Sequence, residues 1–137
     1  MSVEASLPAS APAPPLKVLI DTSAWLAFFR LEDQKTALAV RQAIADGTAM
    51  TAKIVLAELR QAAKSERELA VIADIARSLP IAGEGVSTWN DAAELAYRLK
   101  RKGKMIPLTD CYIAVLVRQH DCRLLTLNPR FRDIAAD

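Results

Sequence analysis

Three carboxylates occupy positions in the sequence from which they could act together. Asp21 ends an apolar run, Glu58 lies among apolar residues of an expected helix, and Asp110 begins another expected helix. Carboxylate oxygens are the ligands that Mg²⁺ and Mn²⁺ prefer in proteins. If the fold brings the three acids to one place, they would form an oxygen-rich metal site.

A plainer structural role competes with this interpretation for each acid. Asp21 could cap the helix that follows it, although Thr22 and Ser23 already offer capping hydroxyls. Glu58 shares a helix face with Val55, so burial there would require a metal or a buried arginine. The alternative is an exposed glutamate.

At Asp110, attraction to a positive helix end explains an acid without any function. A functional role for Asp110 is favoured only if the fold brings it close to Asp21 and Glu58.

The elements that must position these acids alternate between strand and helix. Apolar runs bounded by turn residues predict strands at residues 16–20, 48–51, 81–82 and 123–127. Helical spacing and capping residues predict helices at residues 24–31, 33–46, 51–64, 65–79, 88–102 and 109–120, and a short one after Pro129. Such alternation predicts an α/β/α sandwich with a small, mostly parallel central sheet. Chemistry in such sheets gathers beyond the carboxyl ends of the strands, where Asp21 and Asn128 fall.

Length and composition indicate one globular domain at residues 16–137, because 137 residues with 52% apolar content can bury a core unaided. Residues 1–15 hold four of the seven prolines, and we expect a disordered tail there.

Cys111 and Cys122 have no metal-site spacing, and no apolar run reaches the length of a membrane span. A cytoplasmic, non-membrane protein is the expectation.

Several enzyme classes lack their residues in this chain. The single histidine, His120, excludes a nuclease mechanism that needs two imidazoles, and no glycine-rich phosphate loop is present. A phosphatase of the haloacid-dehalogenase type would need a second acid two residues after Asp21, where Ser23 stands.

Positive charge is concentrated in residues 98–132, which contain nine Lys and Arg and only two acids. This asymmetry indicates a face for a polyanion such as RNA, although cations at a helix end would look the same. The candidate phosphate-binding residues are Arg98, Lys100, Arg101, Lys102, Lys104, Arg130 and Arg132.

Four segments together resemble the PIN-domain proteins, specifically the VapC-type toxins of bacterial toxin–antitoxin pairs. The resemblance covers about residues 16 to 135. Its motifs are Val18-Leu19-Ile20-Asp21-Thr22-Ser23-Ala24-Trp25, Ala57-Glu58-Leu59, Ile106-Pro107-Leu108-Thr109-Asp110-Cys111-Tyr112-Ile113-Ala114 and Leu124-Leu125-Thr126-Leu127-Asn128.

The resemblance implies a PIN-like sandwich that binds Mg²⁺ or Mn²⁺ and hydrolyses RNA, leaving a 5′-phosphate and a 3′-hydroxyl. Asp21, Glu58 and Asp110 would be the catalytic and metal-binding acids, and Ser23 and Thr126 the supporting hydroxyl residues. The fourth metal-binding position of the family, often Asp, is Asn128, which could offer a metal only an uncharged amide oxygen. This departure leaves the number of metal ions open.

The resemblance also implies two protein partners. One is a VapB-type antitoxin, whose basic C-terminal segment would lie across the acidic pocket, and the other is a second copy in a homodimer. The alternative function is a PIN-like module that binds RNA or protein and has lost turnover, which Asn128 leaves open. A plain structural domain with scattered acids is a further alternative.

Overall fold

A short parallel sheet forms the centre of the protein. A computed structural model describes residues 15–136, and in them β1 (Val18–Ile20) lies between β2 (Ala49–Met50) and β3 (Arg123–Leu125). Both pairings are parallel, and the register places Leu19 opposite Met50 and Leu124. The predicted parallel α/β/α arrangement is confirmed. The expected tail lies outside the described residues except for Pro15.

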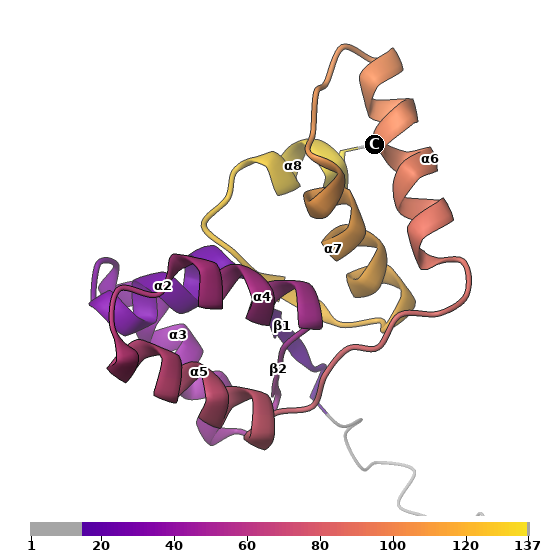
Figure 1. Cartoon of the computed structure of the whole chain (residues 1–137). Coiled ribbons are helices and arrows are strands. Elements are labelled where there is room, and N and C mark those ends of the chain that lie inside the picture. Colours follow the sequence, from indigo (N-terminus) through magenta and orange to yellow (C-terminus); the bar gives the residue numbers. More distant parts are fainter. Residues whose placement is uncertain (1–14, 137) are drawn as a thin grey trace, which may run out of the picture.

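Two groups of helices surround the sheet. Figure 1 shows α2 to α5 gathered on one side of the strands and α6 to α8 on the other. In chain order the helices are α2 (Thr22–Arg30), α3 (Gln34–Ala45), α4 (Lys53–Ala62), α5 (Glu66–Ser78), α6 (Thr88–Arg101), α7 (Leu108–Gln119) and α8 (Arg130–Ala135). In this part of the chain no helix is long and apolar enough to span a bilayer.

The core explains why the site residues are held firmly. Leu19 and Ile20 of β1 are fully buried, as expected for a parallel strand covered on both faces. In α7 every residue from Cys111 to Leu116 is buried, so this helix packs on all sides. Asp110 directly precedes that buried run, and its backbone position is therefore fixed by the packing of the whole helix.

Three sequence predictions about local structure are wrong. Residues 81–82 form no strand and contribute only a single bridge, between Ile81 and Thr51. Because the Thr51 backbone is bonded in that bridge, α4 begins at Lys53 with Ala52 as its N-cap. Thr109 likewise does not cap α7, because Pro107 takes that place and Thr109 lies inside the first turn.

Other helix ends agree with the sequence. Gly47 and Gly103 follow α3 and α6 with φ of 72° and 83°, the left-handed conformation that ends helices. The Ser65 hydroxyl accepts a hydrogen bond from the Glu68 amide, as the capping box predicts. The Glu68 carboxylate accepts from the Lys64 amide, one residue before the position that the box assigns.

Candidate active site

Asp21 lies at the carboxyl end of the central strand and is only 5% exposed. It occupies the N-cap position of α2, yet its side chain makes no capping hydrogen bond. Its Oδ2 instead accepts hydrogen bonds from Ser23 Oγ at 3.1 Å and from Thr126 Oγ1 at 2.8 Å. The capping role therefore does not account for this buried carboxylate.

Backbone amides orient both hydroxyls toward Asp21. The Leu127 amide donates to Ser23 Oγ, and the Asn128 amide donates to Thr126 Oγ1, each at 2.9 Å. Since each hydroxyl accepts an amide proton, its own proton is available to the carboxylate. The two hydroxyl oxygens are 3.3 Å apart, so the start of α2 and the loop after β3 join at Asp21.

Glu58 points from α4 toward the same acids. Its Oε1 accepts a hydrogen bond from Thr22 Oγ1 at 2.7 Å. Burial raises the pKa of Glu58, the negative charges of Asp21 and Asp110 raise it further, and the Thr22 hydroxyl partly opposes them. The alternative of an exposed glutamate is therefore wrong. Among the described residues no arginine or lysine pairs with Glu58.

Asp110 is the third residue of α7, and its side chain is 14% exposed. Its Oδ2 lies 3.2 Å from Arg130 Nε and accepts from Asn128 Nδ2 at 3.3 Å. Burial raises the pKa of Asp110; Arg130 and the Asn128 amide oppose this shift, and the Asp21 charge adds to it. Attraction to the helix end alone does not account for this acid, because its partners come from the loop after β3 and from the first residue of α8.

Asn128 contributes to the site in a way that the sequence did not indicate. Its Oδ1 accepts from the amide and from Nε of Arg130, at 3.0 and 3.4 Å, while its amide group faces Asp110. Asn128 thus holds Asp110 and Arg130 together. Its predicted role as a metal ligand stays a prediction.

The donor set fits a hard divalent cation. No group of three His, Cys, Asp and Glu side chains in residues 15–136 stands in a ready-made metal geometry. Nevertheless the charges of Asp21 and Asp110 raise the pKa of Glu58, and that of Asp21 raises the pKa of Asp110. The described residues give neither Asp21 nor Glu58 a cationic partner. A bound cation would relieve this uncompensated charge, and carboxylate oxygens are its preferred ligands.

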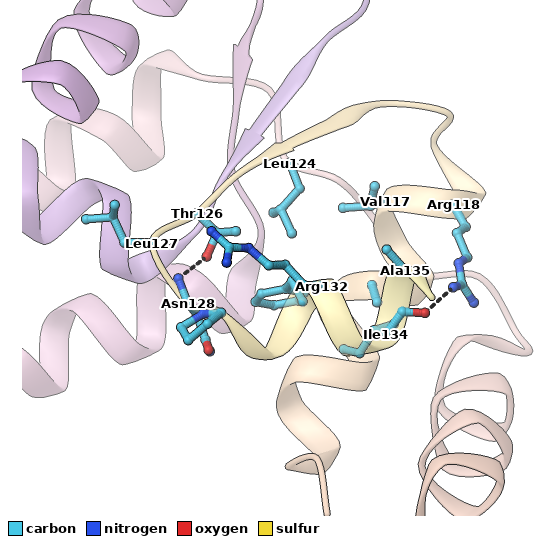
Figure 2. A pocket seen from close by; sticks show the side chains of 12 residues that line it. Val117, Arg118, Leu124, Thr126, Leu127, Asn128, Arg132, Ile134 and Ala135 are labelled. Carbon is cyan, nitrogen blue, oxygen red and sulfur yellow. Dashed lines mark hydrogen bonds between the residues drawn. The ribbon is translucent and has the colours of Figure 1, made fainter. Parts of the chain in front are cut away.

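The predicted phosphate-binding residues fall into two groups. Arg130 reaches Asp110, and Arg132 lines a groove next to Asn128 (Figure 2). The other five lie at the end of α6 and in the loop that leads into the first turn of α7. In that group Arg98 forms an ion pair with Glu94 at 3.1 Å.

Sequence reasoning missed two contacts of the site. Thr22 was singled out only as a capping residue, but its hydroxyl bonds Glu58. Arg130 was singled out only for RNA, but it pairs with Asp110. The adjacency of Thr22 to Asp21 was the signal available for the first, whereas nothing local to Arg130 indicates a partner 20 residues earlier in the chain.

Comparison with known proteins gives one family and a consistent fold. The PIN-domain profile matches residues 18–137. The crystal structure of VapBC2 from Rickettsia felis bound to a DNA fragment from their promoter matches with a TM-score of 0.70, at 23% identity over 87% of this chain and 93% of that one. VapBC-1 from nontypeable Haemophilus influenzae also gives 0.70, at 18% identity over 89% and 94% of the two chains.

DNA-bound VapBC from Salmonella typhimurium gives a TM-score of 0.66, at 22% identity over 87% of this chain and 92% of that chain. At these identities the structural matches establish the fold. No curated protein sequence matches the chain significantly.

Proposed function

The chain belongs to the PIN-domain family, and from this premise we propose that it is a divalent-metal-dependent endoribonuclease of the VapC toxin type. The observation that carries the proposal is the convergence of Asp21, Glu58 and Asp110 at the carboxyl end of the parallel sheet, where burial raises the pKa values of Glu58 and Asp110 and the charge of Asp21 adds to both shifts. Structural domains rarely gather buried acids without a cation.

In the proposed mechanism Asp21 and Asp110 hold the cation, Mg²⁺ or Mn²⁺. When bound, the ion would polarise the scissile phosphate and make water a stronger nucleophile at neutral pH. Ser23 and Thr126 keep the Asp21 carboxylate in one orientation through their hydrogen bonds. Asn128 does the same for Asp110.

Glu58 has the properties of a proton acceptor for the attacking water. Its Oε1 is occupied by the Thr22 hydroxyl, which leaves Oε2 to accept a proton. Because the pKa of Glu58 is raised, the carboxylate is a better base than an exposed glutamate.

The basic residues provide affinity for RNA phosphates rather than a choice of sequence. Arg130 lies at the site, where it is half exposed and could exchange Asp110 for a phosphate oxygen. Arg132 and the basic residues at the end of α6 would extend this contact along the backbone of the RNA.

We further propose that the chain is the toxin of a type II toxin–antitoxin pair. The three structural matches named above are VapBC assemblies, which supports a VapB-type antitoxin partner. A basic antitoxin segment would complement the charge of the acid cluster. We also propose that two copies of the chain form a homodimer.

The second candidate function is a PIN-like binding module without turnover. It is favoured by the Arg130–Asp110 ion pair, in which a protein cation already neutralises one acid, and by the uncharged Asn128. Such a module would bind RNA or protein and gain little from Mn²⁺.

The test compares the wild type with Asp21→Asn on total bacterial RNA, in Mg²⁺ or Mn²⁺ and in EDTA. The proposal predicts discrete metal-dependent fragments with 5′-phosphate ends, and a loss of about 100-fold or more in the variant. A melting temperature that rises with Mn²⁺ in the wild type shows that the site forms even if the RNA is a poor substrate. Unchanged cleavage by Asp21→Asn would overturn the assignment. If the wild type neither cleaves RNA nor is stabilised by Mn²⁺, the result favours the binding module.

A further inference from the structure

A cavity of about 370 Å³ lies between α6 and the loop that connects it to α7. Figure 1 shows this loop leaving the end of α6 and returning to the start of α7. The cavity lining includes Ala93 and Ala96 of α6, Met105 of the loop and Leu108, the first residue of α7. Sites for small ligands usually have volumes of about 300 to 1,000 Å³, so this cavity is large enough for a small organic group.

The sequence around the end of α6 explains why the cavity forms. Ala93 and Ala96 are three residues apart and therefore lie on one face of the helix, where their small side chains leave open space. Gly103 then ends the helix with φ of 83°, and the Lys104 amide donates to the Leu99 carbonyl at 2.8 Å. The loop therefore turns back beside α6 instead of continuing along its axis.

Tyr97 gives the cavity an aromatic ring that has no ring partner. It lines the cavity and is 61% exposed. In the described residues the other exposed aromatic side chain is Trp89, which stacks on Tyr112 with ring centroids 4.1 Å apart. No aromatic ring of residues 15–136 packs on Tyr97 in this way. Free aromatic faces of this kind are the surfaces on which unpaired RNA bases stack.

The charge around the cavity is positive. Lys100 and Lys104 line it, and no acidic side chain from the described part of the chain does so. Neither lysine forms an ion pair with an acid of residues 15–136, and the nearby Glu94 is paired with Arg98. Ammonium groups beside apolar walls suit a ligand that has both a flat apolar group and a phosphate.

The position of the cavity relates it to the acid cluster. Leu108 lines the cavity, and Asp110 follows two residues later, about 3 Å further along the axis of α7. Both residues belong to the first turn of the helix. An RNA whose scissile phosphate lies at Asp110 would therefore have neighbouring nucleotides within reach of the cavity.

We propose that this cavity binds one unpaired base of the RNA substrate, with the base stacked on Tyr97 and the adjoining phosphates at Lys100 and Lys104. The choice of RNA as the ligand rests on the proposed function, whereas binding in the cavity does not require catalysis. The N-terminal segment, residues 1–14, complements the cavity less well because it has a single acid, Glu4, and no aromatic ring.

A base site of this kind would make the protein selective. Contacts to phosphates alone accept any RNA of the right charge. A cavity that must receive a base favours single-stranded loops and ends, whose bases can be turned outward, over paired helices. The inference therefore names an unpaired nucleotide as the feature that is recognised next to the cleaved bond.

The test uses the full chain in EDTA, which prevents metal-dependent cleavage, and two RNAs of equal length and charge. One is hexa-adenylate, and the other is a hexamer of the same backbone without bases. The readout is NMR of the methionine methyl groups, because Met105 lines the cavity whereas Met50 is buried in β2. Hexa-adenylate should shift the Met105 signal through the ring current of the bound base. The abasic hexamer should not shift it, and Met50 should stay unchanged with both.

Variants separate the aromatic contribution from that of charge. Tyr97→Ala should weaken hexa-adenylate binding by about fivefold or more, as expected for the loss of one stacked base. Tyr97→Phe retains the ring and should bind like the wild type, and neither variant should alter binding of the abasic hexamer. Lys100→Gln should weaken binding of both RNAs by the same factor, whereas Lys35→Gln, at an exposed lysine of α3, should change neither.

Three results would overturn the proposal. They are an equal Met105 shift with the abasic hexamer, no Met105 shift with hexa-adenylate up to about 1 mM, and equal hexa-adenylate affinity of Tyr97→Ala and wild type. Self-association that is lost in Tyr97→Ala would instead assign the cavity to a second copy. A Met105 signal that moves in the RNA-free protein on deletion of residues 1–14 would assign it to the N-terminal segment.

These outcomes are distinguishable from failure of the proposed function. Metal-dependent cleavage of RNA without a base-dependent Met105 shift would reject the base site and leave the nuclease in place. A base-dependent Met105 shift in a protein that cleaves no RNA would support the base site and favour the binding module.

Discussion

The two sides of the acid cluster differ in whether a cation of the protein neutralises the carboxylate charge. On the side of β1, α2 and α4, the described residues give the oxygens of Asp21 and Glu58 hydrogen bonds from hydroxyl groups alone, one of which, that of Thr126, reaches Asp21 from the loop after β3. On the side of α7, Asp110 meets the side-chain amide of Asn128, from the loop after β3, and the guanidinium of Arg130, the first residue of α8. The first side carries uncompensated negative charge, whereas the second supplies its own cation.

Because the two sides treat carboxylate charge differently, they have different roles in binding a metal ion. Hydroxyl groups hold a carboxylate in place without cancelling its charge, so the first side remains ready for an external cation. On the second side Arg130 competes for Asp110, but it is 51% exposed and its ion pair is weak enough to be exchanged. We therefore expect the first side to determine whether metal binds and the second to adjust how tightly.

The largest effect should follow from removing a hydroxyl that holds Asp21, the buried acid of the first side. Thr126→Val deletes the group that links the Asn128 amide to Asp21. Groups that orient a metal ligand are worth about 10- to 100-fold in affinity, so Mn²⁺ binding should weaken by that factor in calorimetric titration. Thr126→Ser retains the hydroxyl and should bind Mn²⁺ like the wild type. Equal affinity of Thr126→Val and wild type would contradict the role given to the first side.

A smaller effect of opposite sign should follow from removing Arg130. In Arg130→Ala the Asp110 carboxylate loses its competing cation, and Mn²⁺ affinity should rise about two- to fivefold. Arg132→Ala serves as the matched control, because this neighbouring exposed arginine makes no ion pair with Asp110. A fall in Mn²⁺ affinity in Arg130→Ala would mean that Arg130 positions Asp110 rather than competing for it.

The sequence predicted the framework because its signals are local. The run that ends at Ile20, the glycines at 47 and 103 and the buried stretch of α7 each determine an element from neighbouring residues alone. The strand predicted at 81–82 failed because two residues carry too little pattern, and only the pairing with Thr51 decides their structure.

The site was predictable in its residue types but not in its contacts. Acids at the carboxyl end of a parallel sheet are expected to meet, and the charges of Asp21 and Asp110 add to the rise that burial gives the pKa of Glu58. The connection from Thr126 to Asp21 spans 105 residues, and that from Asn128 to Asp110 spans 18. Side-chain contacts across such separations depend on how helices pack, which no local pattern encodes.

The smallest predicted effect concerns stability without metal and its dependence on pH. The pKa of Glu58 is raised above its ordinary value of 4.5, so the folded protein holds its proton to higher pH than the unfolded chain. Stability contributed by this group is therefore fully present below about pH 4.5 and is lost as pH rises through the raised pKa. Asp110 acts in the same direction, while Asp33 and Glu68, whose pKa values are lowered, act in the opposite one.

Comparison with Glu58→Gln isolates the contribution of Glu58, because the amide still accepts the Thr22 hydrogen bond and never ionises. In EDTA at pH 7 the variant should melt about 1 to 3 °C above the wild type, and the difference should vanish near pH 4. Saturating Mn²⁺ should reverse the order, because the ion requires the charged carboxylates that destabilise the metal-free protein. Glu32→Gln, at an exposed acid after α2, should change neither curve. A lower melting temperature of Glu58→Gln in EDTA would show that Glu58 carries no destabilising charge. The two sides of the cluster would then differ only in their hydrogen bonds.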